Sequence, residues 1–171
     1  MGKRSDFERQ PRDFYPTPME AVEPLLEHLP EDFLFAEPCA GNGALIEHLE
    51  TKGVCMWASD IEPQTKGIHM CGYSDVGFDE LIESDYVITN PPWDRKILHP
   101  MIEYFAPRIR TWLLFDADWA HTKQSAEYMK RCSKIVSVGR IKWFGNMTGK
   151  DNCAWYLFDW EVNNTIFYGR T

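Results

Sequence analysis

The 171-residue sequence predicts one doubly wound α/β domain, with a mostly parallel sheet and an antiparallel β-hairpin near the C-terminus. Apolar runs of strand length alternate with helical patterns through residues 14–133, an order typical of a parallel sheet covered on both faces. Two later apolar runs follow each other across the polar loop 145–152, a pattern that predicts a hairpin at one edge of the sheet. The length and a hydrophobic content of 44% suit one core. We therefore expect a tail over 1–13 and one domain over 14–171.

The first expected element is a helix within the run YPTPMEAVEPLLEHLP. Thr17 and Glu20 have the spacing of a capping box, and Pro18 suits the first helical position. Apolar residues at helical spacing continue to Pro30, where we expect the helix to end.

The remaining elements follow from the same periodicities. In chain order they are a strand over 33–36, a helix over 44–52, a strand over 54–60, a short helical pattern over 64–69, a strand over 86–89, a helix over 97–106, a strand from 111, a helix over 123–133, and strands over 134–144, 152–160 and 165–169. Because ligands bind at the carboxyl ends of strands in open α/β sheets, the residues that follow the strands are the candidate site.

A glycine-containing turn follows the first strand in the run EPCAGNG. Gly41 and Gly43 allow positive φ and a close approach of the backbone to a ligand. The turn lacks both the G-x-G-x-x-G pattern of dinucleotide sites and the lysine of a P-loop. Glu37, which precedes it, would repel a pyrophosphate and suit a ligand with an ammonium or sulfonium group. A plain tight turn is the alternative interpretation.

Asp60 ends the second strand, 17 residues after Gly43. An acidic residue about 20 residues beyond a glycine turn, at the end of the next strand, is where a ribose diol is bound. The alternative is a carboxylate that caps a helix or a turn.

The apolar strand 86–88 runs into Asn90-Pro91-Pro92-Trp93. Asn90 offers an amide oxygen and two N–H donors, while the prolines fix φ and remove two backbone donors. Carbonyl acceptors beside the flat face of Trp93 suit an amino group on a planar ring. The alternative is a proline turn beside a tryptophan of the core.

The charges of the chain are divided unevenly along the sequence. Residues 14–94 hold two basic and sixteen acidic residues, a net charge of −14, whereas residues 95–150 hold eleven basic and four acidic residues, a net charge of +7. Such asymmetry indicates either an anionic partner on one side of the protein or ordinary solvated faces.

The five cysteines are widely spaced without a C-x-x-C motif, and no histidine stands at metal-ligand spacing from them. We therefore expect reduced thiols in a cytoplasmic protein and no metal site. The sequence has no apolar run of the ~18–20 residues that a membrane span needs, and its N-terminus lacks the apolar segment of a signal peptide.

Together these motifs resemble those of class I S-adenosylmethionine-dependent methyltransferases, which have a Rossmann-like fold. AEPCAGNG is similar to their cofactor motif I, SDIEP to motif II, TNPPW to the catalytic (D/N)PP(Y/F/W) motif, and FYPTP to a segment that precedes the first helix in adenine-N6 enzymes. The late run GRIKWFGNMTGKDNCAWYLFDW resembles small phage-type methyltransferases.

The resemblance implies that S-adenosyl-L-methionine is the cofactor and assigns a role to each matching residue. It implies a cofactor-binding set of Thr17, Pro18, Glu37, Cys39, Gly41, Gly43, Asp60, Ile61 and Asp75, with Asp79 as a rival to Asp75 at the adenine amine. It implies a catalytic set of Asn90, Pro91, Pro92 and Trp93, in which Asn90 and the Pro91 carbonyl accept hydrogen bonds from the target amine and Trp93 stacks on the target.

Asp116, Asp118 and Trp119 follow the strand that begins at 111. By position they are expected to line the same edge of the sheet, with a role in substrate contact or proton acceptance.

Three hypotheses remain for the target. The favoured one is adenine N6 in DNA, because a flipped base suits Trp93 and the basic residues 95–150 suit phosphates. The second is an RNA adenine or a protein glutamine amide, and the third is a relic that binds the cofactor without turnover. The oligomeric state and the recognition sequence stay open.

Overall fold

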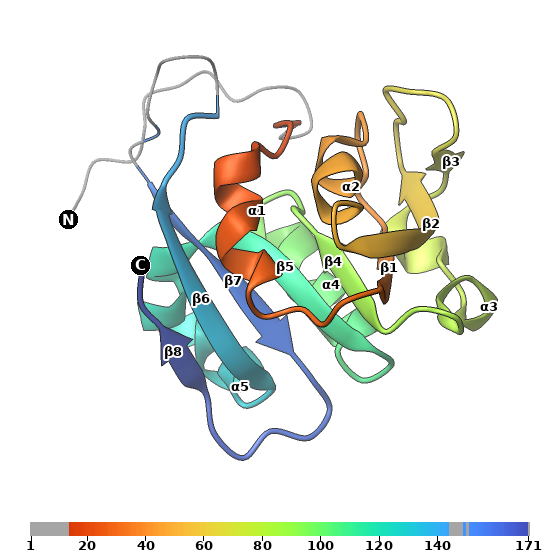
Figure 1. Cartoon of the computed structure of the whole chain (residues 1–171). Helices are drawn as coiled ribbons and strands as arrows, with labels where there is room; N and C mark the ends of the chain where they lie inside the picture. The colour runs from red at the N-terminus through yellow and green to blue at the C-terminus, as the bar shows by residue number, and fades with distance from the viewer. Residues whose placement is uncertain (1–13, 144–148, 150, 171) are drawn as a thin grey trace.

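The computed structural model describes residues 14–143, 149 and 151–170, and the predicted tail 1–13 lies outside them. Within this part of the chain, eight strands form one sheet in the order β3-β2-β1-β4-β5-β7-β6-β8 (Figure 1). The strands are β1 (Phe33–Glu37), β2 (Gly53–Asp60), β3 (His69–Met70), β4 (Tyr86–Thr89), β5 (Arg110–Asp116), β6 (Cys132–Arg140), β7 (Asn152–Phe158) and β8 (Ile166–Tyr168). The helices are α1 (Met19–Leu26), α2 (Ala44–Leu49), α3 (Phe78–Leu81), α4 (Arg95–Phe105) and α5 (Ala126–Met129), with 3-10 turns η2 (Tyr73–Asp75), η3 (Ala117–His121) and η4 (Lys123–Ser125).

The predicted fold class is confirmed. Strands β1 to β5 pair in parallel, and β7 runs antiparallel to both β5 and β6. The hairpin of β6 and β7 is therefore present, but it does not form the edge of the sheet. Strand β8 pairs in parallel with β6 and continues the sheet beyond it.

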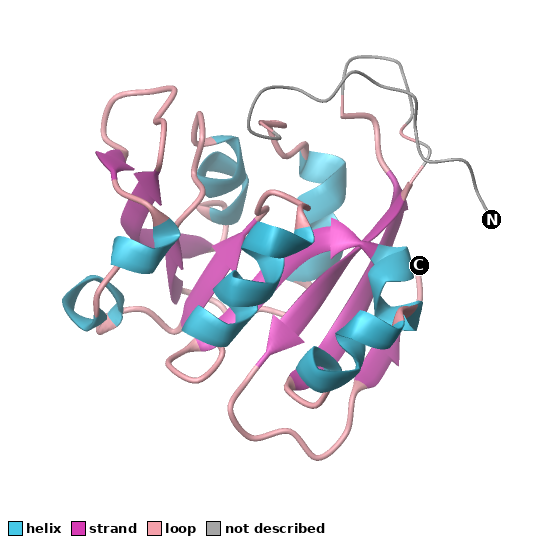
Figure 2. Cartoon of the chain, turned by 180° about the vertical axis from the view of Figure 1, so that it is seen from behind, coloured by secondary structure: helices cyan, strands magenta, loops and turns pink. Residues whose placement is uncertain are grey.

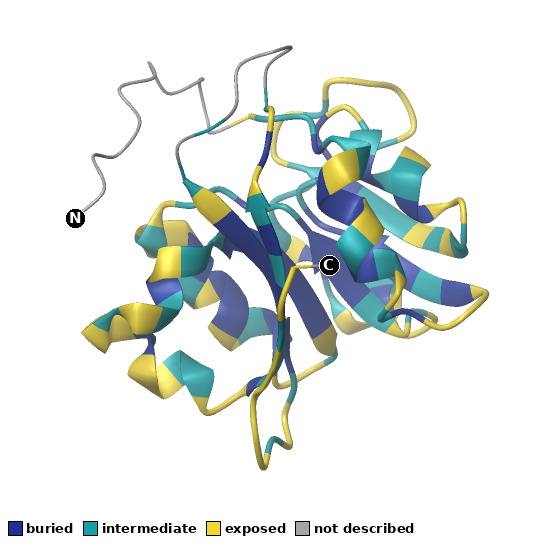
Figure 3. Ribbon diagram, turned by 60° about the vertical axis from the view of Figure 1, so that its left-hand side comes forward, coloured by how far each residue is buried: buried dark blue, intermediate teal, exposed yellow. Residues whose placement is uncertain are grey.

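Helices cover both faces of the sheet, which gives the chain two apolar cores. Figures 1 and 2 show α1 and α2 on one face and α4 and α5 on the other. Alternate residues of β5 serve the two sides, because successive side chains of a strand point in opposite directions. Trp112 and Leu114 pack under α1 and α2, whereas Leu113 and Phe115 pack against α4. The inner strands β1, β4, β5 and β7 are accordingly largely buried, while the edge strands β3 and β8 and the outward surfaces of the helices are mostly exposed (Figure 3).

The first helix differs from its prediction at both ends. It begins at Met19 with Pro18 as its N-cap, and no side chain caps it. The expected capping box is wrong, since the Glu20 carboxylate instead accepts a hydrogen bond from the Lys142 backbone N–H at 2.7 Å. The helix ends at Leu26 rather than at Pro30.

Two other helical predictions are corrected by the structure. Residues 64–69 are not helical; they form turns that lead into β3. The helix expected over 123–133 is reduced to η4 and the single turn of α5, and β6 begins at Cys132. Among the described residues, no helix combines the length and apolar character required to cross a membrane.

Candidate functional site

The carboxyl ends of β1, β2 and β4 meet at one edge of the sheet. Because β1 lies between β2 and β4 and pairs with both in parallel, Glu37, Asp60 and Asn90 are brought to the same edge. The sequence separates these three residues widely, so parallel pairing is what assembles the predicted site.

The glycine turn after β1 is held by backbone hydrogen bonds to its neighbours. The Ala40 N–H donates to the Ser59 carbonyl at 2.9 Å, and the Gln64 N–H donates to the Gly41 carbonyl at 2.9 Å. Gly41 has φ +53° and Gly43 has φ +85°, values that glycine adopts without strain. A Cβ added to Gly41 would lie 2.6 Å from the Phe14 ring, so both conformation and space require glycine there.

Asp60 holds this turn with both carboxylate oxygens. Its Oδ2 accepts from the Gly41 N–H at 2.8 Å, and its Oδ1 accepts from the Glu62 N–H at 2.7 Å. The interpretation of Asp60 as a turn carboxylate is therefore correct. A ribose-binding role is compatible with it, because each carboxylate oxygen keeps further acceptor capacity.

Glu37 is a buried carboxyl group without a hydrogen-bond partner. Its side chain is 1% exposed, and neither oxygen makes a hydrogen bond within the described chain. Burial raises its pKa to about 8, Asp60 adds to the rise, and the nearby Thr89 hydroxyl and Cys39 backbone offset part of it. Burying a carboxyl group without a partner is costly, so Glu37 favours a ligand that carries hydrogen-bond donors.

Two hydroxyl groups near the ends of neighbouring strands are also unpartnered within the described chain, and the Thr89 hydroxyl is the one that lies near Glu37. Ser59 Oγ near the end of β2 and Thr89 Oγ1 at the end of β4 are also buried without a hydrogen-bond partner among the described residues. Cys39 stands beside Glu37, and burial raises the pKa of its thiol far above the usual range. The raised pKa disfavours the thiolate, which is the nucleophilic form of cysteine.

Both polar atoms of the Asn90 side chain make hydrogen bonds within the protein. Its Nδ2 donates to Thr17 Oγ1 at 3.1 Å and, more weakly, to the Tyr15 carbonyl at 3.5 Å. Its Oδ1 accepts from the Trp93 indole N–H at 3.3 Å. The segment before α1 is thereby joined to the end of β4.

Three aromatic side chains form a chain of ring contacts that begins at Trp93, next to the Asn90 amide. The ring of Trp93 meets that of Trp143 edge-on, with centroids 5.9 Å apart, and Tyr15 meets Trp143 at 6.1 Å. Tyr15 and Trp143 are not among the site residues expected from the sequence. Tyr15 lies two residues before the predicted Thr17, which is a signal in the sequence. The sequence around Trp143 carries no signal that the segment after β6 lies beside the segment after β4.

The other predicted residues are placed as follows. Pro91 is buried and Pro92 is half-buried, and Pro18 caps α1 beside Thr17. Ile61 is 65% exposed just beyond Asp60. Asp75 in η2 and Asp79 in α3 are both exposed, so the structure does not choose between them.

Trp119 does not line the edge, contrary to the prediction. It is 2% exposed, packs edge-on against Phe115 and donates its indole N–H to His99 Nε2 at 3.0 Å. Asp116 and Asp118 do lie at the carboxyl end of β5, where the Asp116 carboxylate accepts from the Asp118 N–H and starts η3.

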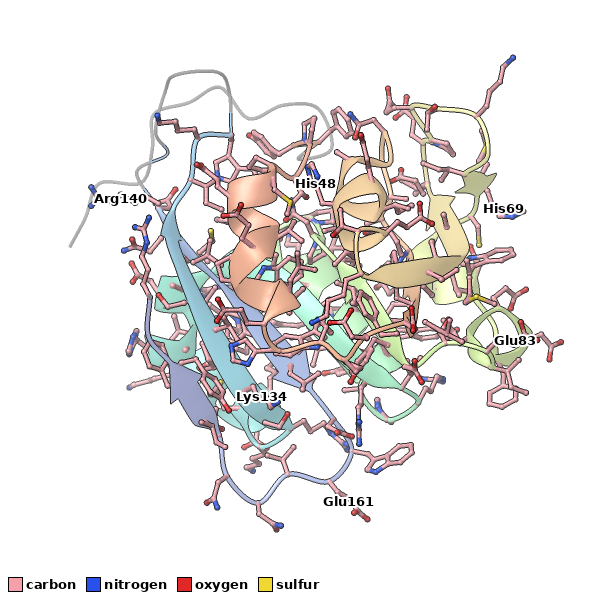
Figure 4. All side chains as sticks on the ribbon, viewed as in Figure 1. His48, His69, Glu83, Lys134, Arg140 and Glu161 are labelled. Atoms are coloured by element: carbon pink, nitrogen blue, oxygen red, sulfur yellow. The ribbon has the colours of Figure 1, made fainter. Side chains whose placement is uncertain are left out.

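Basic residues stand at the same edge of the sheet. Strand β6 is parallel to β5, because both are antiparallel to β7, so residues that follow β4, β5 and β6 share the edge with the site. Figure 4 shows Arg140 at the upper end of β6 and Lys134 toward its lower end. The basic residues that end or follow these strands, none in an ion pair within the described chain, are Arg95, Lys96, Lys123, Arg140 and Lys142.

Comparison of the structure with solved structures identifies a methyltransferase fold. A Pyrococcus horikoshii protein, provisionally assigned as an RNA methyltransferase, is 14% identical with a TM-score of 0.62 over 94% of both chains. A structure of the E. cuniculi Mtq2–Trm112 complex, which methylates the termination factor eRF1, matches at 12% identity and TM-score 0.57 over 81% of this chain and 92% of that one.

The M protein of the type I restriction enzyme EcoKI matches at 11% identity and TM-score 0.58, over 90% of this chain and 47% of that one. The sequence itself matched no protein-family model and no curated protein. At these identities the likeness shows the fold alone, an α/β fold that this chain shares with these methyltransferase structures.

Proposed function

We propose that this chain is an S-adenosylmethionine-dependent N-methyltransferase whose target is adenine N6 in DNA. The observation that carries the proposal is the pairing of two features on adjacent strands. A buried, unpartnered carboxyl group ends β1, and an amide followed by two prolines ends β4. The first suits a cationic ligand and the second suits a neutral amine.

The residues at the strand ends fit the proposed cofactor. Glu37 offers two free acceptors to an ammonium group, and the nearby Thr89 adds a hydroxyl. Asp60, Gly41 and Gly43 form a turn whose backbone a ligand can approach closely. Thr17 and Pro18 lie next to Asn90 through the Thr17 hydrogen bond. When bound, S-adenosylmethionine supplies an electrophilic methyl group on its sulfonium.

Asn90 and Pro91 would carry the chemistry on the protein side. Asn90 Oδ1 and the Pro91 carbonyl accept hydrogen bonds from the target amine and stabilise the positive charge that develops on its nitrogen. Prolines at 91 and 92 stiffen these acceptors, so the catalytic effect rests on positioning and preorganised dipoles. The aromatic group of Tyr15, Trp93 and Trp143 provides ring surface for a planar target.

The basic residues around the site favour a nucleic acid. Arg95, Lys96 and Lys123 follow β4 and β5, Arg140 ends β6 and Lys142 follows it, so basic side chains lie on the β4, β5 and β6 side of the edge at which the amine would be methylated, alongside the acidic Asp116 and Asp118. Phosphate contacts by such residues position a strand without reading its sequence. A base would reach Asn90 by flipping out of the duplex.

Two measurements test this proposal in sequence. Calorimetry should show binding of S-adenosylmethionine and of its demethylated product, and absence of binding to both would refute the methyltransferase assignment. Incubation with radiolabelled methyl donor and separate pools of DNA, RNA and protein should then label DNA. Label confined to RNA would move the target to an RNA adenine, and label confined to protein would move it to an amide.

A further inference from the structure

The two ends of the Asn90 amide are not equivalent for catalysis. Only Oδ1 can accept a hydrogen bond from a target amine, whereas Nδ2 would set donor against donor. An asparagine amide can turn by half a rotation about its last torsion with little change in shape. A catalytic asparagine at this position therefore needs neighbours that distinguish oxygen from nitrogen.

The chemistry of its partners fixes the orientation of the Asn90 amide. The indole N–H of Trp93 is only a donor, so the atom 3.3 Å from it must be the oxygen. The backbone carbonyl of Tyr15 is only an acceptor, so the atom 3.5 Å from it must be the nitrogen. The Thr17 hydroxyl, 3.1 Å from Nδ2, accepts in the same arrangement.

The surroundings make this three-point contact rigid. Thr17 is 4% exposed, so water competes little for its hydroxyl. Pro91 and Pro92 fix two φ angles between Asn90 and Trp93, and Trp143 packs edge-on against the Trp93 ring at an interplanar angle of 82°. The carbonyl oxygen of Asn90 has two lone pairs, so it can keep the Trp93 contact and accept from an amine.

We propose that Trp93 and Thr17 are positioning residues that hold the Asn90 amide with its oxygen toward the target amine. The proposal rests on the methyltransferase function put forward above. It gives Trp93 a role through its indole N–H, in addition to any stacking by its ring, and it gives Thr17 a role toward the catalytic amide in addition to any contact with the cofactor.

The kinetic test separates the indole N–H from the ring. Trp93→Phe keeps an aromatic ring and removes the donor, so kcat should fall about tenfold, the scale of one lost hydrogen bond, while KM for the nucleic acid changes less than threefold. Thr17→Val should lower kcat similarly, and Thr17→Ser, which keeps the hydroxyl, should restore it to within about threefold of wild type. Trp160→Phe is the matched control, because Trp160 is 61% exposed after β7.

A role in stacking alone makes the opposite prediction. Trp93→Phe would then keep nearly full kcat and Trp93→Leu would lose it, and that result would overturn the proposal while leaving the methyltransferase function intact. Equal activity of Thr17→Val and Thr17→Ser would overturn the part assigned to the Thr17 hydroxyl.

A second measurement does not depend on methyl transfer. In an amide-proton NMR spectrum of the full chain, the Trp93 indole resonance is assigned by its loss in Trp93→Phe. It should shift upfield in Asn90→Ala, and to a smaller extent in Thr17→Val, but stay in place in Thr17→Ser. An unshifted indole resonance in Asn90→Ala would show that the contact is absent and would refute the proposal even if the enzyme is active.

Discussion

Replacing the buried Glu37 by glutamine isolates the charge that the proposed cofactor site depends on. With a pKa of about 8, the carboxyl group is neutral in about nine of ten molecules at pH 7. Binding of an ammonium group requires the carboxylate, so the wild-type protein should release about 0.9 proton when S-adenosylmethionine binds at pH 7. Glu37→Gln has no proton to release and should bind at least about tenfold more weakly, because it loses a charge-assisted hydrogen bond.

Calorimetry at pH 7 in phosphate and in Tris measures the proton release directly. The two buffers differ in ionisation enthalpy, so the wild-type binding enthalpy should differ between them in proportion to the released proton. The binding enthalpy of Glu37→Gln should be the same in both buffers. The reasoning about Glu37 is refuted if the variant shows the same buffer dependence as wild type, or if wild type shows none.

The same substitution changes the pH dependence of stability. The folded pKa of about 8 lies above the ordinary value of 4.5, so the folded state favours the protonated carboxyl. Its contribution is fully present below pH 4.5 and is lost as the pH rises through 8. In urea unfolding, wild type should therefore lose about 4 kcal/mol of stability relative to Glu37→Gln between pH 5 and pH 8.5, and parallel pH profiles would contradict the assignment.

Two substitutions in the glycine turn test its architecture in the absence of cofactor. In Asp60→Asn, the new amide NH2 group would face one of the two backbone N–H groups that the carboxylate now accepts from. The unfolding free energy should fall by about 1–3 kcal/mol, which corresponds to a decrease of roughly 2–10 °C in Tm. An unchanged Tm would mean that Asp60 does not hold the turn. Gly41→Ala should lower the free energy of unfolding by about 1–2 kcal/mol. The decrease should exceed that of the control Gly67→Ala, because both glycines have positive φ but only Gly41 has the Phe14 ring against it. Equal decreases in denaturant titrations would show that the contact with Phe14 is unimportant.

The sheet could be predicted from sequence because its strands are short apolar runs bounded by turn residues. The strand expected over 33–36 became Phe33–Glu37, and the strand expected to stop at Asp60 does so. The insertion of β7 between β5 and β6 could not be predicted from apolar runs. Strand order depends on contacts across the chain, and local periodicity carries no information about it.

The errors in the site have a similar origin. Thr17 and Glu20 match a capping box locally, but each has a distant partner, Asn90 and Lys142, that competes for the same atom. The position of Trp119 after a strand end predicts that it lines the site edge of the sheet, yet the aromatic core beneath α4 gives its large apolar surface a better environment.

The central claim is that the amide ending β4 carries methyl transfer while the neighbouring strand ends bind the cofactor. Asn90→Ala with unmethylated DNA and radiolabelled S-adenosylmethionine tests it most directly, with cofactor affinity measured on the same preparation. The account predicts wild-type label recovered as N6-methyladenine, at least a hundredfold loss of transfer in the variant, and a cofactor Kd within about threefold of wild type. Undiminished transfer by Asn90→Ala, or loss of cofactor binding in step with transfer, would contradict it.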